Sequence, residues 1–140
     1  MAVQDAIERI QYHARLVSGI RAAPDNVDLP AANHEVFAFT YLKDGEMGVE
    51  AHSQGRDIHN LETQITYTGG DALNIEKHAE AALEAFVNLL RGDPLLNSKV
   101  DTIDFPIRYS VSRESEGNVK KLVFTITTRV KIRPTFTVTS

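Results

Sequence analysis

The stretch that most limits the possible folds is "LVFTITTRVKIRP", which runs from Leu122 to Pro134. Its apolar residues stand two apart and alternate with Thr, Arg and Lys, which is the period of a β-strand with one buried and one exposed face. The apolar set is Leu122, Phe124, Ile126, Val130 and Ile132, and Thr128 is the one polar residue in that register. A strand of this kind requires a sheet that is covered on one side and polar on the other.

Two amphipathic segments can supply that cover. Apolar residues recur at three- and four-residue steps from Val3 to Val17 and again from Ile75 to Leu90, and each run carries one apolar stripe. Gly92 and Pro94 end the second segment, and Gly92 is predicted to take the left-handed cap conformation. Helices with a single stripe must bury it against one face of one sheet.

Further strands are predicted on both sides of the second helix. The predicted strands are Glu35–Leu42, Met47–Ala51, Ile58–Thr68, Ile103–Ser112 and Val119–Arg133. "KDGE", residues 43–46, is predicted as a hairpin turn with Gly45 at positive φ, and "HSQGRD", residues 52–57, as a polar loop. "RESEGN", residues 113–118, is predicted to join the last two strands. The predicted fold class is a two-layer α+β domain, an antiparallel sheet with two helices packed on one face, in the order α-β-β-β-α-β-β.

Length and composition fit a single domain over residues 1–140. A chain of 140 residues buries enough surface without staples, and the absence of cysteine excludes disulfides, thiolate metal sites and cysteine nucleophiles. The apolar runs are too short to cross a bilayer and the first residues do not resemble a signal peptide, so we expect a soluble, unprocessed chain. Residues 134–140, "PTFTVTS", are expected to form either an edge strand or an arm that pairs with a neighbour.

Charge is divided unevenly along the chain. Residues 1–98 carry 7 basic and 15 acidic residues, a net charge of −8, whereas residues 99–140 carry 8 basic and 4 acidic residues, a net charge of +4. Such a partition allows one copy to complement another head to tail, and contacts of this type produce rings or filaments. The alternative is that the two parts neutralise each other within one subunit.

Motifs for catalysis are not found. The sequence contains no G-x-G-x-x-G, P-loop, H-E-x-x-H or G-x-S-x-G pattern. His52, Asp57 and His59 do not have the spacing that zinc sites favour. "RGD", residues 91–93, reads as a helix C-terminus. No catalytic, cofactor-binding or metal-binding residue is therefore predicted, and an enzyme is not favoured.

A sheet-based module for nucleic acid or another ligand is an alternative interpretation. An open sheet face beside Arg129, Lys131 and Arg133 is typical of some RNA-binding domains, but those domains use aromatic side chains to stack bases and are usually basic. This chain has a net charge of −4, and the other residues in the same outward row as the basic ones are Val123, Thr125 and Thr127.

Four motifs, in this order and spacing, resemble the small tail-terminator or tail-completion proteins of long-tailed bacteriophages and prophages. They are "GIRAAPD" at Gly19–Asp25, "GRDIHNLETQITY" at Gly55–Tyr67, "LLRGDPLLNSKVDTI" at Leu89–Ile103 and "FTITTRVKI" at Phe124–Ile132. The resemblance spans about Val3 to Ile132. Another connector protein of the phage neck is the alternative within this class.

The resemblance implies a structural virion protein without catalytic activity. It would cap the head-proximal end of the tail tube as a ring, typically of six copies, and contact the major tail tube protein and a head-completion or neck protein. It would lie in the tail and neck of the virion and in the host cytoplasm during assembly, with no membrane partner and no specific nucleic-acid binding, although DNA would pass through the ring. The fold it implies, an antiparallel sheet with two helices on one face, agrees with the periodicity.

The contact residues can be assigned only by region. Contacts between subunits are predicted for Arg129, Lys131, Arg133, Thr125 and Thr127. Contacts with the tube or neck are predicted for the loop after the first hairpin, in particular Lys43, Asp44, Glu46, His52, Gln54, Arg56 and Asp57.

Overall fold

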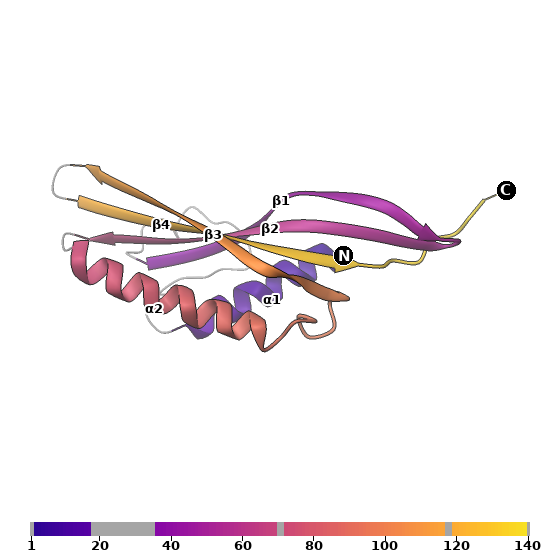
Figure 1. The fold of residues 1–140 in the computed structure, drawn as a ribbon, viewed down its shortest axis with the longest axis horizontal. Helices are drawn as coiled ribbons and strands as arrows, with labels where there is room; N and C mark the ends of the chain where they lie inside the picture. The colour runs from indigo at the N-terminus through magenta and orange to yellow at the C-terminus, as the bar shows by residue number, and fades with distance from the viewer. Residues whose placement is uncertain (1, 18–35, 70–71, 117–118, 140) are drawn as a thin grey trace.

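The fold has a layer of helices on one face of an antiparallel sheet (Figure 1). The computed structural model describes residues 2–17, 36–69, 72–116 and 119–139. Within them lie the helices α1 (Ala2–Leu16) and α2 (Ala72–Arg91) and the strands β1 (Val36–Ala51), β2 (Gln54–Gly69), β3 (Thr102–Glu116) and β4 (Val119–Ile132). The strand order is β1-β2-β4-β3. The predicted two-layer α+β class is confirmed.

The predicted order of elements is wrong in one place, because β1 is continuous where two strands and a turn were predicted. Residues 43–46 stay in the ladder with β2, and a register shift after Leu42 makes Lys43 an extra residue, a β-bulge. The chain turns instead at His52 and Ser53, and Ser53 has a φ of 62°. Gly45 is not in the left-handed region. The described residues therefore contain four strands, where five were predicted.

The second hairpin is also tighter than predicted. β3 continues to Glu116 and β4 begins at Val119, so most of "RESEGN" belongs to β3. The motif at Gly19–Asp25 and residues 117–118 of the predicted loop lie outside the described residues.

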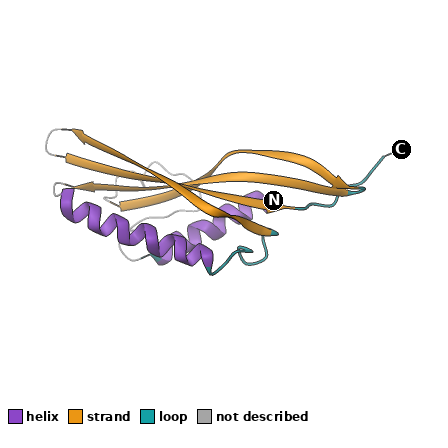
Figure 2. Cartoon of the chain, viewed as in Figure 1, coloured by secondary structure: helices purple, strands orange, loops and turns teal. Residues whose placement is uncertain are grey.

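The core lies between the helices and one face of the sheet. The alternating apolar residues of β4 are buried as predicted, except Ile132, which is half-buried, and Thr128 is buried with them opposite Leu61. α1 packs on β1 and α2 packs on β2 and β4 (Figure 2). The connection from β2 through α2 to β3 passes over β4, so β3 lies at the edge of the sheet beyond α2.

The sheet is longer than the helix layer that covers it. β1 and β2 each have 16 residues, about 50 Å at roughly 3.3 Å per residue. α2 has 20 residues, about 30 Å at 1.5 Å per residue, and α1 has 15. The β1–β2 hairpin therefore projects beyond the helices (Figure 1).

A buried polar bridge attaches α1 to the sheet. The Gln11 side chain donates a hydrogen bond from Nε2 to the carbonyl oxygen of Ala38 at 3.0 Å and accepts one from Thr40 Oγ1 at 2.6 Å. Thr40 Oγ1 is also 2.9 Å from Thr63 Oγ1 on β2. Gln11, Thr40 and Thr63 are all buried, so breaking one bond leaves a polar group without a partner in an apolar layer.

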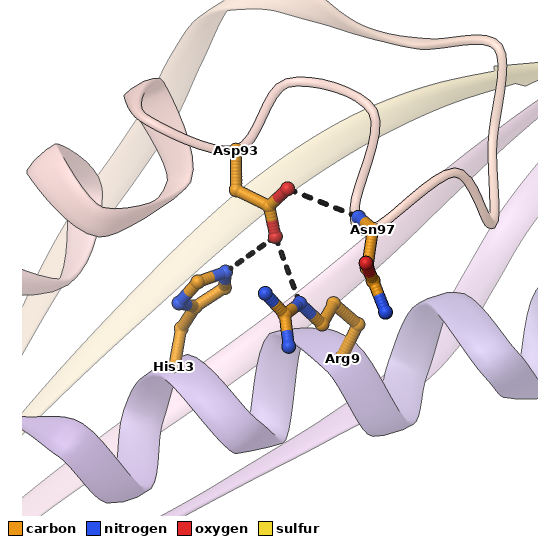
Figure 3. Close-up of polar contacts among 4 residues, drawn as sticks. All are labelled: Arg9, His13, Asp93 and Asn97. Atoms are coloured by element: carbon orange, nitrogen blue, oxygen red, sulfur yellow. Dashed lines mark hydrogen bonds and ion pairs between the residues drawn. The ribbon is translucent and has the colours of Figure 1, made fainter.

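Asp93, in the turn that follows α2, holds the second contact with α1 (Figure 3). Its Oδ2 lies 2.8 Å from Arg9 Nε and 2.8 Å from His13 Nε2, and its Oδ1 accepts a hydrogen bond of 3.0 Å from the backbone N–H of Asn97. Burial acts to raise the pKa of Asp93, but the hydrogen bonds from Arg9, Asn97 and His13 and the charge of Arg9 outweigh it and lower the pKa to about 2.

The "RGD" stretch thus has a structural role in this fold. Arg91 is the last residue of α2 and donates to Asn88 Oδ1 at 2.9 Å, as expected near a helix C-terminus. The prediction of a left-handed Gly92 is wrong: Gly92 continues the helical pattern with a hydrogen bond to the Asn88 carbonyl, and positive φ angles occur later, at Leu96, Asn97 and Ser98. The turn is set by the Asp93 contacts.

Asp93→Asn should lower the free energy of unfolding by about 1–2 kcal/mol at neutral pH, because the amide cannot supply the charge that Arg9 pairs with. The pKa of about 2 in the folded state lies below the ordinary aspartate value of 3.8. The stabilisation is therefore present above pH 3.8 and is lost as the pH falls through 2. Urea unfolding between pH 5 and pH 2 measures this, with the exposed Asp101→Asn as control. An unchanged pH dependence in Asp93→Asn would contradict the assignment.

Candidate functional site

The first candidate surface is the face of the sheet opposite the helices, here called the open face. Side chains alternate along β4, so the residues between the buried ones point to this face: Val123, Thr125, Thr127, Arg129 and Lys131. Their neighbours in the ladder include Gln64 and Glu62 on β2 and Ser110 and Arg108 on β3. All of the predicted subunit-contact residues of β4 therefore share one face.

Two of the predicted contact residues already form ion pairs within the chain. Arg129 Nε lies 3.4 Å from Asp104 Oδ2, and Arg133 Nε lies 3.0 Å from Glu50 Oε2. Both basic side chains are about half exposed, and ion pairs at such positions contribute about 0–1 kcal/mol. Of these two pairs, Arg133–Glu50 joins the basic part of the chain to the acidic part, whereas Asp104 belongs to the basic part itself. Both pairs are weak enough to be exchanged.

An aromatic pair on the open face was not found from the sequence. Phe39 and Tyr41 on β1 stack with ring centroids 5.7 Å apart. The Tyr41 hydroxyl donates to Glu62, and Gln64 Nε2 donates to it at 3.2 Å. Burial, together with the hydrogen bond to Glu62 and its charge, raises the pKa of Tyr41. The signal was present in "EVFAFTYL": Phe39 and Tyr41 alternate with Ala38 and Thr40, which are buried, but the nearly continuous apolar run hid the alternation.

The second candidate surface is the projecting part of the β1–β2 hairpin, residues 43–57, here called the distal ribbon (Figure 1). The prediction of a tube-contact loop in this region is wrong in its conformation, since nearly all of these residues are paired in the ladder and only His52 and Ser53 form the turn. These residues lie at the end of the hairpin that projects beyond the helices (Figure 1).

The predicted contact residues of the distal ribbon do not share one face. Asp44, Glu46 and Arg56 point to the open face, whereas Asp57 points to the helix side together with buried His59. Lys43 pairs with Glu62 at 3.5 Å, Asp44 accepts a hydrogen bond from Asn60 at 2.7 Å, and His52 is exposed in the turn.

An exposed apolar strip follows the helix side of the distal ribbon. After the bulge at Lys43, the residues of β1 that pair with Asp57 and Gly55 are Met47 and Val49, which are 75% and 72% exposed. They extend the line of Leu42, which is also exposed, beyond the helix layer. Sequence reasoning missed this strip because a predicted turn stood where the bulge is.

Residues 134–136 continue the line of β4 along the tip of the distal ribbon. The backbone N–H of Gly55 donates to the Pro134 carbonyl at 2.8 Å, and that of Phe136 donates to the Ser53 carbonyl at 3.0 Å. The Gln54 side chain donates to the Arg133 carbonyl at 2.9 Å. Of the two alternatives for "PTFTVTS", this first part lies against its own chain, and Val138 beyond it is exposed.

A groove of about 470 Å³ lies between α2 and the edge strand β3. Leu122 and Phe124 of β4 line it together with residues from both flanking elements. These are Glu80, Leu83, Glu84, Val87 and Arg91 from α2 and Ile107, Tyr109, Val111 and Arg113 from β3. Tyr109 packs edge-on against Phe124 and is still 60% exposed. The groove exists because α2 covers β2 and β4 and stops short of β3.

No cluster in the described ranges has the composition of a metal site: three or more His, Asp or Glu side chains do not converge anywhere in them. In particular, His59 is buried beneath Gly45 while His52 sits in the turn, so the two histidines considered above do not meet. Neither described helix is both long enough and apolar enough to span a membrane.

Comparison of the sequence with protein-family models and with curated proteins gave no match.

Two glycines of the distal ribbon, Gly45 and Gly48, differ in the space that a Cβ atom would have. A Cβ on Gly45 would lie 2.4 Å from the Ile58 carbonyl oxygen and 3.0 Å from His59 Cα, whereas one on Gly48 would lie 3.5 Å from the Arg56 carbonyl oxygen. Gly45→Ala should therefore destabilise the protein by about 1–3 kcal/mol through overpacking, and Gly48→Ala should be close to neutral. Urea unfolding of both variants measures the difference, and equal stability would contradict the described register.

Proposed function

We propose that this chain is a structural component of the tail of a long-tailed bacteriophage or prophage, which ends the tail tube as a ring of copies. The sequence resemblance supports this assignment, and the two-layer fold is the one that the resemblance implies. Another connector of the phage neck is the alternative within the same class. The proposed role requires no catalytic residue.

The observation that carries the proposal is the distal ribbon. A hairpin that projects beyond its helix layer, with exposed Met47 and Val49 on one face and charged side chains on the other, offers contact surface on both faces. A subunit that joins a ring and also contacts a tube needs surfaces of this kind that its own core does not use. The ribbon is the proposed contact with the tail tube or neck protein.

The open face supports contacts between copies of the chain. Arg129 pairs with Asp104 and Arg133 pairs with Glu50, and both ion pairs are exposed. Replacing either partner by an acidic residue of a neighbouring copy would therefore cost little free energy. Complementary charge of this type fixes the register of an interface and increases association rates more than it adds affinity. We therefore place Thr125, Thr127 and the three basic residues in a contact between subunits.

The triple variant Arg129→Glu, Lys131→Glu, Arg133→Glu should remain folded and fail to assemble. Surface substitutions usually change stability by about 0.5 kcal/mol each, whereas reversing three charges replaces attraction across the proposed contact by repulsion. The parent should form rings and cap polymerised tubes of the cognate tail tube protein, as seen by electron microscopy and light scattering.

The matched control reverses charge elsewhere, at the exposed residues Lys77 and Lys99. The double variant Lys77→Glu, Lys99→Glu should assemble and cap tubes like the parent. Normal capping by the triple variant would reject the open-face contact, and a parent that never binds tube ends would reject the proposed function.

One observation favours a second candidate, a sheet-based module for single-stranded nucleic acid. The stacked Phe39 and Tyr41 provide the aromatic surface on the open face that the sequence did not indicate. Against this, Glu62 bonds directly to Tyr41 and would place negative charge beside a bound phosphate.

A gel shift with single-stranded RNA or DNA separates the two candidates. We expect no salt-dependent shift from the parent. Binding that weakens steeply with salt and is lost in Tyr41→Ala would instead favour the nucleic-acid module, because phosphate contacts release counterions.

A further inference from the structure

We propose that the segment 136–139 of one copy occupies the groove between α2 and β3 of the next copy, where it adds a strand to the edge of β3. This inference rests on the self-association proposed above and names the two surfaces that meet.

The acceptor is a groove of mixed apolar and charged lining beside a strand edge. β3 has 15 residues and pairs with β4 on one side, and it has no strand partner on the other side among the described residues. Leu83 and Val87 of α2 form one wall and Phe124 lies at the floor. A strand edge with free backbone groups, next to a groove that contains apolar side chains, favours the addition of an extended segment whose alternate side chains enter the groove.

The donor has the properties such a segment needs. Phe136 and Val138 stand two apart, so in an extended conformation they point to the same side, and they are 39% and 46% exposed. Residues 134–139 carry no charge, so they would bring no charged side chain into the groove. The last backbone hydrogen bond described for the segment is that of Phe136 with Ser53.

The segment cannot reach the groove of its own chain. Tyr109 in the groove lies in the same ladder row as Ile126 and Thr63, whereas Phe136 is bonded to Ser53 at the ribbon tip. Thr63 is ten residue steps from Ser53 along the chain, about 33 Å at roughly 3.3 Å per residue. From Phe136 the chain runs away from the body, past the tip (Figure 1). The occupant must therefore come from another molecule.

A contact of this kind is heterologous. Each copy presents one donor at the ribbon tip and one acceptor at the α2–β3 edge, so every contact leaves a free donor at one end and a free acceptor at the other. Such contacts close into a ring when the rotation between copies allows it. The groove thus supplies the head-to-tail link that a ring needs.

Disulfide trapping in full-length chains tests the contact, because the chain contains no cysteine of its own. Val138→Cys and Tyr109→Cys chains are mixed and oxidised mildly, with and without tail tubes. The expected product is a mixed dimer, and the double variant carrying both changes should give a ladder or a closed oligomer on non-reducing gels. Both positions are exposed, so neither change should disturb the fold.

Two further cysteine variants control for chance collisions. Ser110→Cys is exposed next to Tyr109 but points to the open face, and Val49→Cys lies on the exposed strip of the distal ribbon. Ser110→Cys mixed with Val138→Cys should give no cross-linked dimer. Val49→Cys mixed with Tyr109→Cys should give none either. A Val49–Tyr109 product in place of the Val138–Tyr109 product would make the ribbon the occupant and overturn the inference.

The strength of the contact gives a second readout. Phe136→Ser with Val138→Ser should weaken self-association at least tenfold by light scattering without lowering the unfolding temperature. Association of undiminished strength in this variant would overturn the inference, as would the lack of a Val138–Tyr109 product. If the chains cap tubes but do not form this cross-link, the inference is rejected and the proposed function stands. If they form the cross-link but never bind tubes, the proposed function is rejected and the contact between copies stands.

Discussion

The structure depends on a mismatch in length between its two layers. Strands of 16 residues extend about 50 Å, but helices of 15 and 20 residues extend only about 22 and 30 Å. The helices can bury the sheet over little more than half its length. The distal ribbon and its exposed strip follow from this difference in length, because they lie where the helix layer does not reach.

Two polar contacts determine which part of the sheet is covered. Gln11 joins α1 to β1 and β2 from within the apolar layer, and Asp93 joins α1 to the turn after α2. An apolar stripe can shift along a sheet at a modest cost in free energy. A buried amide or carboxylate, in contrast, finds its hydrogen-bond partners in one position only. These contacts therefore locate the helices, and the apolar core supplies the larger part of the stabilisation.

The fold class followed from periodicity, because alternation in β4 and the helical stripes each report on one neighbouring layer. The bulge at Lys43 could not be predicted, since "KDGE" has the composition of a turn and only the pairing with β2 keeps it in the sheet. The site was predicted in part. The face of Arg129 follows from alternation, but the Phe39–Tyr41 stack and the α2–β3 groove depend on how strands and helix are placed side by side.

The bulge at Lys43 also determines the chemistry of each face of the distal ribbon. Before it, even-numbered residues of β1 face the helices, and after it odd-numbered residues do, which places Met47 and Val49 there and leaves Asp44 and Glu46 on the open face. If Lys43 instead took a regular place in the ladder, every later residue of β1 would move one position along β2 and the two sets would exchange faces. The exclusion of one lysine from the ladder thus decides which side chains of the ribbon a partner would meet on each side.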